Sequence, residues 1–176
     1  MRIIAGERRG ARIAAPPGLL TRPTGDSVRE AAFNLIGPVE GASVLDLFAG
    51  SGALGLEALS RGAASATFVE SDRAACRVIS ENLAKLRLKG ARVTCADAIW
   101  TLKRETGSYD LVLVDPPYER WAELESTLAE PLARVLAPAG LLVVETASRT
   151  EPALPLALRT SRRYGSARLT LFEPSP

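Results

Sequence analysis

The chain has 176 residues, 47% of them hydrophobic, which suffices for one compact domain with a full core. It contains no histidine and two cysteines, which excludes the usual serine and cysteine triads, most zinc sites and a disulfide scaffold. No window approaches the roughly 20 unbroken apolar residues of a membrane span, and no secretory signal pattern opens the chain. We therefore expect a cytoplasmic protein with no membrane partner and no metal.

Charge is unevenly distributed along the sequence. The net charge is +2. Residues 1–36 contribute +3, from six arginines against three acidic residues, and the other residues contribute −1. A basic end on a nearly neutral body favours a polyanionic partner.

The first 37 residues predict an extension ahead of the main domain. Two short strand patterns, at 2–5 and 11–14, flank a loop with glycines at its ends, which indicates a β-hairpin. A proline-rich connector follows, and then Ser27-Val28-Arg29-Glu30 has the spacing of a capping box before a helix-periodic segment. The helix is predicted to end at Ile36, because Gly37-Pro38 follows.

From residue 43 onward, strand and helix patterns alternate. This alternation implies right-handed crossovers and a parallel sheet covered by helices on both faces. The sequence therefore predicts an α/β fold whose sheet is closed by two more strands near the C-terminus. Predicted strands cover 43–48, 64–69, 91–94, 109–114, 140–145, 156–160 and 168–172, and predicted helices cover 54–61, 73–88, 99–105 and 121–136.

A glycine-rich loop follows the first of these strands. Residues 46–52 read Asp-Leu-Phe-Ala-Gly-Ser-Gly, and the glycines let the backbone turn tightly and approach a ligand at a helix N-terminus. Residues 50–55 also match the dinucleotide fingerprint, with Glu70 as the acidic residue at the end of the second strand. A lone match of this kind does not establish an NAD site.

Two features favour S-adenosylmethionine over NAD. Asp46 lies inside the strand end, where a carboxylate can face the sulfonium and ammonium groups, and the chain is too short for a separate substrate domain. Glu70 is predicted to accept both ribose hydroxyls with either cofactor. Asp97, after the third strand, is predicted to meet the adenine amino group, with an N-cap of the next helix as the alternative. The predicted cofactor site comprises Asp46, Phe48, Ala49, Gly50, Ser51, Gly52, Glu70, Asp97 and Ala98.

The motif Asp115-Pro116-Pro117-Tyr118 follows the apolar run 111–114. Two prolines fix φ and remove two backbone donors, so carbonyl groups can point outward at the carboxyl edge of the sheet, where open α/β sheets bind ligands. The Asp115 carboxylate and the Pro116 carbonyl are predicted to accept both N–H bonds of a base amino group and to aim its lone pair at the methyl group. Tyr118 is predicted to offer a ring face for stacking of the base. These four residues are the predicted catalytic site.

The predicted reaction needs no dedicated general base. Transfer proceeds by in-line displacement on the sulfonium, and the proton can leave once the nitrogen is cationic, so Asp115 acts by orientation and charge stabilisation. Methylation at carbon 5 of a pyrimidine would instead need a nucleophilic cysteine at this turn. Cys76 lies in a predicted helix and Cys95 at a strand end away from the turn, and both are predicted to be small buried hydrophobic residues.

Over nearly its whole length, the sequence resembles the bacterial 16S ribosomal RNA guanine-N2 methyltransferases. Residues 2–6, Arg-Ile-Ile-Ala-Gly, and Arg22-Pro23-Thr24 are the more family-specific segments, whereas many amino methyltransferases share the glycine loop and the proline turn. One departure is Ser27 after Asp26, where relatives are expected to have arginine. Further matching segments are 9–10, 28–31, 33–34, 44–52, 56–63, 68–70, 115–118 and 163–165.

The resemblance implies a Rossmann-like class I methyltransferase domain at 38–176 and, at 1–37, an RNA-binding extension of hairpin, connector and helix. It also implies that a monomer transfers a methyl group from S-adenosylmethionine to N2 of a guanine in 16S rRNA, within the small ribosomal subunit or an assembly intermediate. The basic extension would then contact phosphates. The predicted RNA-binding residues are Arg8, Arg9, Arg12 and Arg22.

Several other functions share parts of this pattern. Adenine-N6 methylation of DNA or RNA uses a similar turn, and protein glutamine methylation uses a close variant that begins with asparagine. An NAD-dependent oxidoreductase, from a different class of enzyme, shares the glycine pattern. A non-catalytic RNA-binding module is a further alternative, and the complete set of acidic residues at 46, 70, 97 and 115 counts against it.

Overall fold

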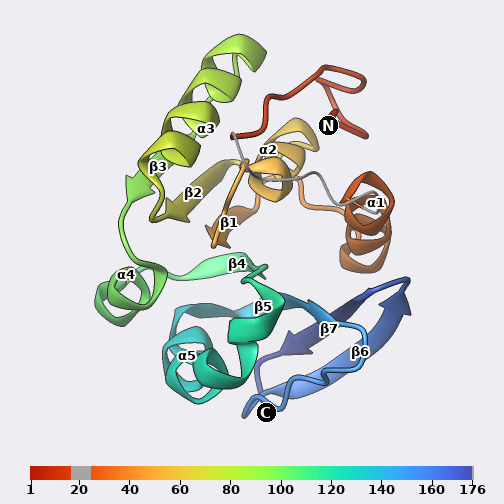
Figure 1. Ribbon diagram of the computed structural model, residues 1–176, viewed down its shortest axis with the longest axis vertical. Helices are drawn as coiled ribbons and strands as arrows, with labels where there is room; N and C mark the ends of the chain where they lie inside the picture. Colours follow the sequence, from red (N-terminus) through yellow and green to blue (C-terminus); the bar gives the residue numbers. More distant parts are fainter. Residues whose placement is uncertain (17–24, 176) are drawn as a thin grey trace.

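The computed structural model describes residues 1–16 and 25–175 (Figure 1). Strands and helices alternate from residue 43 onward, as the sequence predicts. The elements, in chain order, are α1 (Gly25–Ile36), β1 (Ser43–Leu47), α2 (Ala53–Ser60), β2 (Ser65–Glu70), α3 (Arg73–Leu86), β3 (Ala91–Cys95), α4 (Ala98–Arg104), β4 (Tyr109–Val114), the 3-10 helix η1 (Tyr118–Arg120), α5 (Trp121–Val135), β5 (Leu136–Ala147), β6 (Ala157–Tyr164) and β7 (Ala167–Glu173).

The seven strands form one sheet in the order β3-β2-β1-β4-β5-β7-β6. Strands β1 to β5 pair in parallel, whereas β7 runs antiparallel to both of its neighbours. The predicted mostly parallel, seven-stranded sheet is thus confirmed, and its topology is Rossmann-like. The strand order reverses between β1 and β4, and open α/β sheets bind ligands at such a switch point, outside the carboxyl ends of the strands.

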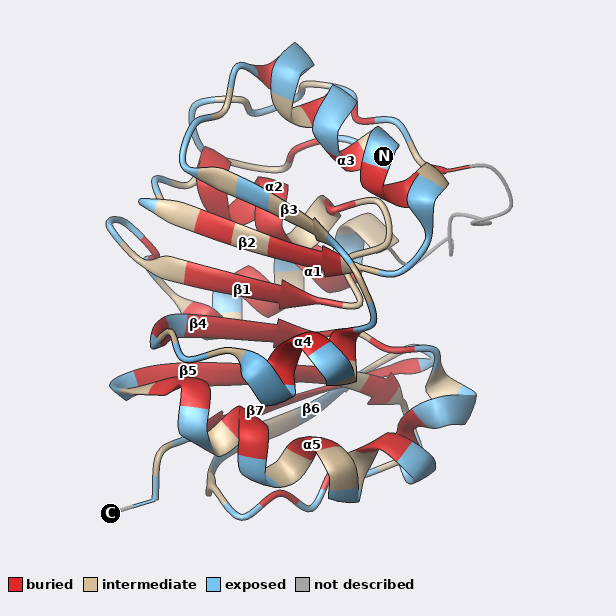
Figure 2. Ribbon diagram, turned by 90° about the vertical axis from the view of Figure 1, so that its left-hand side faces the viewer, coloured by how far each residue is buried: buried red, intermediate tan, exposed pale blue. Residues whose placement is uncertain are grey.

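Helices cover both faces of the sheet, as predicted (Figure 2). Helices α1, α2 and α3 pack against one face in a cluster that includes Phe33, Leu56 and Ile79. Helices α4 and α5 pack against the other face, around Leu102 and Trp121. The central strands β1 and β4 are therefore buried on both faces, which explains why apolar residues predominate in them. Among the described residues, no helix is both long and apolar enough to cross a membrane.

The N-terminal segment, residues 1–16, differs from the predicted two-stranded hairpin. Its two halves are antiparallel and share a bridge between Arg2 and Arg12 and backbone bonds such as that from the Ile3 N–H to the Ala11 carbonyl oxygen at 2.9 Å, but neither half forms a strand. The backbone N–H groups of Ile4 and Ala5 donate to the Glu57 carboxylate of α2, at 2.8 and 2.9 Å. The neighbouring Ile3 and Ile13 are buried in the same cluster as α1 and α2, so this segment shares the core of the main domain.

Several predicted boundaries are also wrong, among them that of β6, which ends at Tyr164 and not at residue 160. Helix α1 begins at Gly25, two residues before the predicted cap, so Ser27 lies within its first turn. Strand β5 begins at Leu136, although the proline and glycine that follow it are typical of a loop. Its pairing with β4 shifts register between Tyr109 and Leu111, and this irregularity accommodates the additional residues in the sheet.

Only one of the two cysteines is buried, contrary to the prediction for both. Cys95 is exposed because it ends β3, an edge strand of the sheet. Cys76 is buried and donates its S–H to the Glu70 carbonyl oxygen at 3.3 Å. Burial raises the pKa of the Cys76 thiol to about 12, so this thiol stays protonated and unreactive.

Candidate active site

A cavity of about 430 Å³ opens at the carboxyl edge of the sheet. Its volume lies within the range of roughly 300–1,000 Å³ that is typical of small-molecule sites. The loop after β1, the acidic end of β2 and the turn after β4 all contribute to its wall, so it spans the switch point. The lining residues on which the site depends are Arg29, Asp46, Gly50, Glu70, Asp115, Pro117 and Glu145.

The loop after β1 has a backbone conformation that favours glycine. Gly50 and Gly52 have φ values of 55° and 77°, which residues with a side chain rarely adopt. A Cβ atom at residue 52 would also lie 3.0 Å from Cγ1 of Ile79 in α3. Gly52 caps α2 beneath the cavity surface and is not a lining residue. The predicted loop residues that line the cavity are Phe48, Ala49, Gly50 and Ser51.

Asp46 lies in β1 and is 1% exposed. Its Oδ2 accepts a hydrogen bond from the backbone N–H of Gly55, in the first turn of α2, at 2.9 Å. Burial raises the pKa of this carboxyl to about 7, with a smaller contribution from the nearby Glu70 charge, although the Gly55 N–H acts in the opposite direction. Burial therefore holds Asp46 near the point where its charge changes at neutral pH, and a bound cation would favour the charged form.

This pKa predicts how stability depends on pH. The usual pKa is 3.8, so between about pH 4 and 7 the folded state binds more protons than the unfolded state, and stability falls as pH rises by about 1.4 kcal/mol per pH unit. Asp46→Asn keeps the shape but does not titrate. The free energy of unfolding, measured in urea, should therefore decline over this range more steeply in the wild type than in Asp46→Asn. Equal slopes would contradict the assigned pKa.

Glu70 ends β2 beside the glycine loop. Its Oε2 accepts from the backbone N–H of Gly50 at 2.8 Å, and its Oε1 accepts from the backbone N–H of Asp72 at 2.8 Å. These bonds join the carboxylate to the loop after β1 and to the N-cap of α3. The Ser71 hydroxyl also donates to Oε1 at 3.5 Å. A carboxylate offers about four lone-pair sites, so Glu70 retains capacity for a ribose hydroxyl of a bound ligand, chiefly at Oε2.

Asp97 and Ala98 are not among the residues that line the cavity. Asp97 is exposed and is the N-cap of α4, where its Oδ1 accepts from the backbone N–H of Trp100 at 2.8 Å. This is the alternative role that the sequence allowed. A contact between Asp97 and an adenine amino group stays a prediction.

The turn after β4 faces the cavity with two of its four residues. Asp115 and Pro117 line the cavity, whereas Pro116 is buried and Tyr118 lies outside the lining. The Tyr118 ring packs against the cluster beneath α1 to α3, and its hydroxyl donates to Oε1 of Glu145 at 2.7 Å. Stacking of a base on Tyr118 stays a prediction, and its hydroxyl has a partner that the sequence analysis did not identify.

Four charged lining residues were missed by the sequence analysis, namely Arg29, Glu119, Arg120 and Glu145. Glu119 and Arg120 are exposed in η1. Arg29 of α1 is 4% exposed and donates through Nη2 to Oδ1 of Asp26 at 2.9 Å. Arg29 belongs to the capping-box pattern of residues 27–30, and this pattern predicts the start of a helix and not a position at the cavity. Glu145 follows the buried run of β5 as Glu70 follows that of β2. The same rule, an acid where an apolar run ends, could therefore have identified it.

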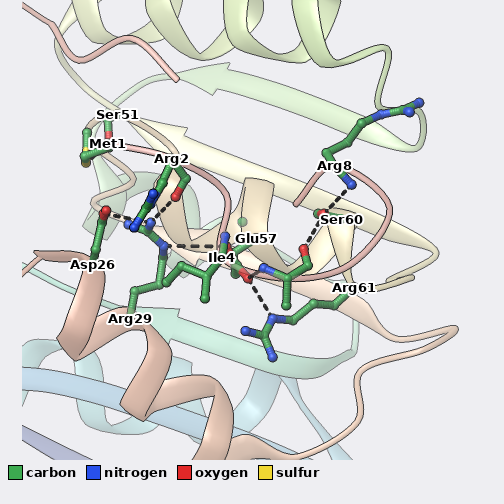
Figure 3. Close-up of polar contacts among 12 residues, drawn as sticks. Met1, Arg2, Ile4, Arg8, Asp26, Arg29, Ser51, Glu57, Ser60 and Arg61 are labelled. Carbon is green, nitrogen blue, oxygen red and sulfur yellow. Dashed lines mark hydrogen bonds and ion pairs between the residues drawn. The ribbon is translucent and has the colours of Figure 1, made fainter. Parts of the chain in front are cut away.

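Glu57 of α2 joins the N-terminal segment to the wall of the site (Figure 3). Its side chain is 0% exposed and accepts the two backbone N–H groups of Ile4 and Ala5. It also accepts from Nε of Arg61 at 2.8 Å and pairs with Nε of Arg29 at 3.7 Å. Buried carboxylates persist when they are paired and hydrogen-bonded. Glu57 therefore connects a cavity residue, Arg29, to the beginning of the chain.

The predicted RNA-binding arginines differ in their surroundings. Arg9 and Arg12 are exposed, and the carbonyl oxygen of Arg12 accepts from Nζ of Lys85 on α3 at 2.9 Å. Arg8 is half-buried, and its Nη2 lies 3.8 Å from the Glu7 carboxylate. Arg22 lies outside the described residues.

Comparisons with known proteins agree with this architecture. The chain is 49% identical over 131 residues to ribosomal RNA small subunit methyltransferase D of Escherichia coli (strain K12), an alignment that covers 73% of this chain and 65% of that protein. It is 47% identical over 125 residues to YlbH of Bacillus subtilis (strain 168), which covers 68% of this chain and 67% of that protein. The solved structure of yhhF from Escherichia coli superposes with a TM-score of 0.85, at 39% identity, over 99% of each chain.

The family model described as conserved hypothetical protein 95 matches residues 1–173. The aligned part of this chain spans 65% of the length of the first of these relatives. The match to the family model, in contrast, spans almost all of this chain, including the N-terminal segment and both cavity motifs. The chain therefore belongs to the family described as conserved hypothetical protein 95 and is a relative of the proteins named ribosomal RNA small subunit methyltransferase D.

Proposed function

We propose that this protein transfers a methyl group from S-adenosylmethionine to the exocyclic N2 of a guanine in 16S rRNA. The observation that supports this most strongly is that Gly50 and Glu70, from the predicted cofactor site, line the same cavity as Asp115 and Pro117 of the predicted catalytic turn. A donor and an acceptor bound there would lie within one cavity, which is the condition for direct transfer.

The residues present fit this cofactor. Glu70 is a fixed carboxylate beside a glycine loop, which suits a ribose, and Asp46 is a buried carboxyl whose charged form a cationic ligand would stabilise. S-adenosylmethionine, when bound, supplies an electrophilic methyl group. The contribution of the chain is to orient the acceptor: Asp115 and the Pro116 carbonyl accept the N–H bonds of the amino group and stabilise the positive charge that develops on nitrogen.

The relatives support the choice of substrate. The name of the Escherichia coli protein specifies ribosomal RNA of the small subunit. The family that the sequence resembles methylates N2 of guanine. Exposed Arg9 and Arg12 on the N-terminal segment provide cationic groups for phosphates. The partner we propose is 16S rRNA within the small subunit or an assembly intermediate, bound by a monomer in the cytoplasm.

The direct test is methylation of purified 16S rRNA, both naked and within small subunits, with S-adenosylmethionine labelled in its methyl group. After digestion to nucleosides, we expect the label in N2-methylguanosine. Label in N6-methyladenosine would overturn the choice of base. Titration with S-adenosylmethionine and with NADH should show binding of the first alone, and binding of NADH alone would support an oxidoreductase.

Removal of two N-terminal charges should weaken RNA binding in a salt-dependent manner. For the double variant Arg9→Ala with Arg12→Ala, the slope of log K against log salt should fall by about 0.7 to 0.9 for each phosphate that is no longer neutralised. The matched control replaces Arg162 and Arg163 with alanine. Both are exposed on β6, which is one edge strand of the sheet, and β3 is the other edge strand. Fluorescence anisotropy at several salt concentrations measures both slopes. An unchanged slope in the N-terminal variant would exclude phosphate binding by these two arginines.

A further inference from the structure

The turn that carries Asp115 has a second acid beside it. Strands β4 and β5 pair in parallel with Val114 opposite Val144. The next residue in each case is acidic: Asp115 follows the end of β4, and Glu145 lies near the end of β5, so the two acids stand at neighbouring positions at the same edge of the sheet. Both residues line the cavity. A substrate group that reaches Asp115 therefore approaches Glu145 as well.

Glu145 is held in place by the turn itself. The Tyr118 hydroxyl donates to Oε1 of Glu145 at 2.7 Å, so the catalytic motif and the neighbouring strand are joined by a hydrogen bond. An ionised carboxylate is a hydrogen-bond acceptor only. Glu145 is thus fixed as a hydrogen-bond acceptor next to Asp115.

Asp46 and Glu70, the cavity acids of β1 and β2, have different partners at a different part of its wall, and the exposed Glu119 lies in η1. Glu70 accepts from the backbone N–H groups of Gly50 and Asp72. Asp46 is buried and accepts from the backbone N–H of Gly55. These contacts tie both carboxyls to the loops around α2 and α3, the part that we assign to the cofactor. Glu145 is the acid whose neighbour in the sheet is the catalytic turn.

The hydrogen-bonding edges of purines differ in a way that two adjacent acids can detect. Guanine presents N1–H and the 2-amino group side by side, both donors. Adenine presents its amino group beside N1, which is an acceptor. A carboxylate opposite N1 would bond to guanine and would be left unpaired, or repelled, opposite adenine. A site with buried polar groups rejects a ligand that fails to pair with them far more strongly than an apolar site does.

We propose that Glu145 is the residue that selects guanine, by accepting the N1–H while Asp115 accepts from the 2-amino group. This rests on the proposed function, because it assigns the base-reading role within that site. Tyr118 is a positioning residue, since it acts through Glu145. The selection is independent of the methyl transfer chemistry, which takes place at the amino nitrogen.

The test uses two RNA substrates that carry either guanine or 2,6-diaminopurine at the target position. Both bases have the reacting 2-amino group, but N1 of 2,6-diaminopurine is an acceptor and carries no hydrogen. The wild type should prefer guanine in kcat/KM by roughly 10- to 100-fold. In Glu145→Gln the side-chain amide can still accept from Tyr118 through its oxygen and can donate to N1 of 2,6-diaminopurine. The preference should therefore fall by about tenfold or more, or reverse.

The control is Glu130→Gln, an exposed glutamate on α5 outside the cavity lining, which should keep the wild-type preference. If Glu145→Gln does not fold, Tyr118→Phe replaces it, and loss of the fixing bond should lower the preference by roughly threefold to tenfold. Equal wild-type rates on both substrates, or a variant with the wild-type preference, would overturn the role of Glu145. Failure of the wild type to form N2-methylguanosine would instead overturn the proposed function, and the wild type alone reveals it.

Discussion

Replacing Asp115 with alanine is expected to lower kcat by roughly 10²- to 10³-fold, the usual cost of removing one preorganised polar group from a reacting centre. The loss should be in turnover, because Asp115 lines the cavity at the turn after β4, and Glu70 with the glycine loop forms a separate part of the wall. Calorimetric titration should therefore give a dissociation constant for S-adenosylmethionine close to that of the wild type.

The matched control is Asp110→Ala, at the other end of the same strand. Asp110 accepts from the backbone N–H and the hydroxyl of Ser43, both at 2.8 Å, so its loss should lower stability and leave kcat unchanged. Wild-type turnover in Asp115→Ala, measured with labelled cofactor and 16S rRNA, would show that the proline turn does not orient the acceptor.

Replacing Glu57 with alanine is expected to have the largest effect on stability, a loss of about 3–5 kcal/mol in the free energy of unfolding. The substitution would leave buried Arg29 without its partner at 3.7 Å and would remove the acceptor for the N–H groups of Ile4 and Ala5. Urea denaturation measures the loss. The N-terminal segment should also become accessible to proteases, because its attachment to α2 is weakened.

Glu81→Ala is the control for this substitution. Glu81 is exposed on α3, and surface substitutions of this kind usually change the free energy of unfolding by no more than about 0.5 kcal/mol. A loss below about 1 kcal/mol in Glu57→Ala would mean that the buried carboxylate is not the principal attachment of the N-terminal segment.

The strands and helices after residue 43 could be predicted because each is specified by its own local pattern. The predicted boundaries of β4 match the observed ones, Tyr109–Val114, since the buried apolar run 111–114 is typical of a central parallel strand and ends at the acidic Asp115. The N-terminal segment could not be predicted in the same way. Besides its local bonds, its backbone N–H groups donate to the side chains of Glu57 and Ser60, more than 50 residues away. No local pattern in residues 2–14 indicates a side-chain partner at that distance.

The residues of the candidate site fall into the same two groups, those that a local sequence pattern predicts and those that it does not. The glycine loop and the proline turn are contiguous motifs, and both supply residues to the cavity, where the sequence predicts them. Arg29 and Glu145 enter the site through packing and strand register, and neither belongs to a motif that extends across the cavity. Asp97 is different, because its position in the sequence suits both a helix cap and a ligand contact. In the structure it is the N-cap of α4.

The proposed function requires that one cavity binds the methyl donor and the guanine together. The most direct measurement is the affinity of a bisubstrate compound in which guanine N2 is linked to the donor at the position of the methyl group. We expect this compound to bind much more tightly than S-adenosylmethionine does, and we expect Glu70→Ala and Asp115→Ala each to weaken its binding. Affinity no greater than that of S-adenosylmethionine, or affinity insensitive to Asp115→Ala, would contradict the proposed function.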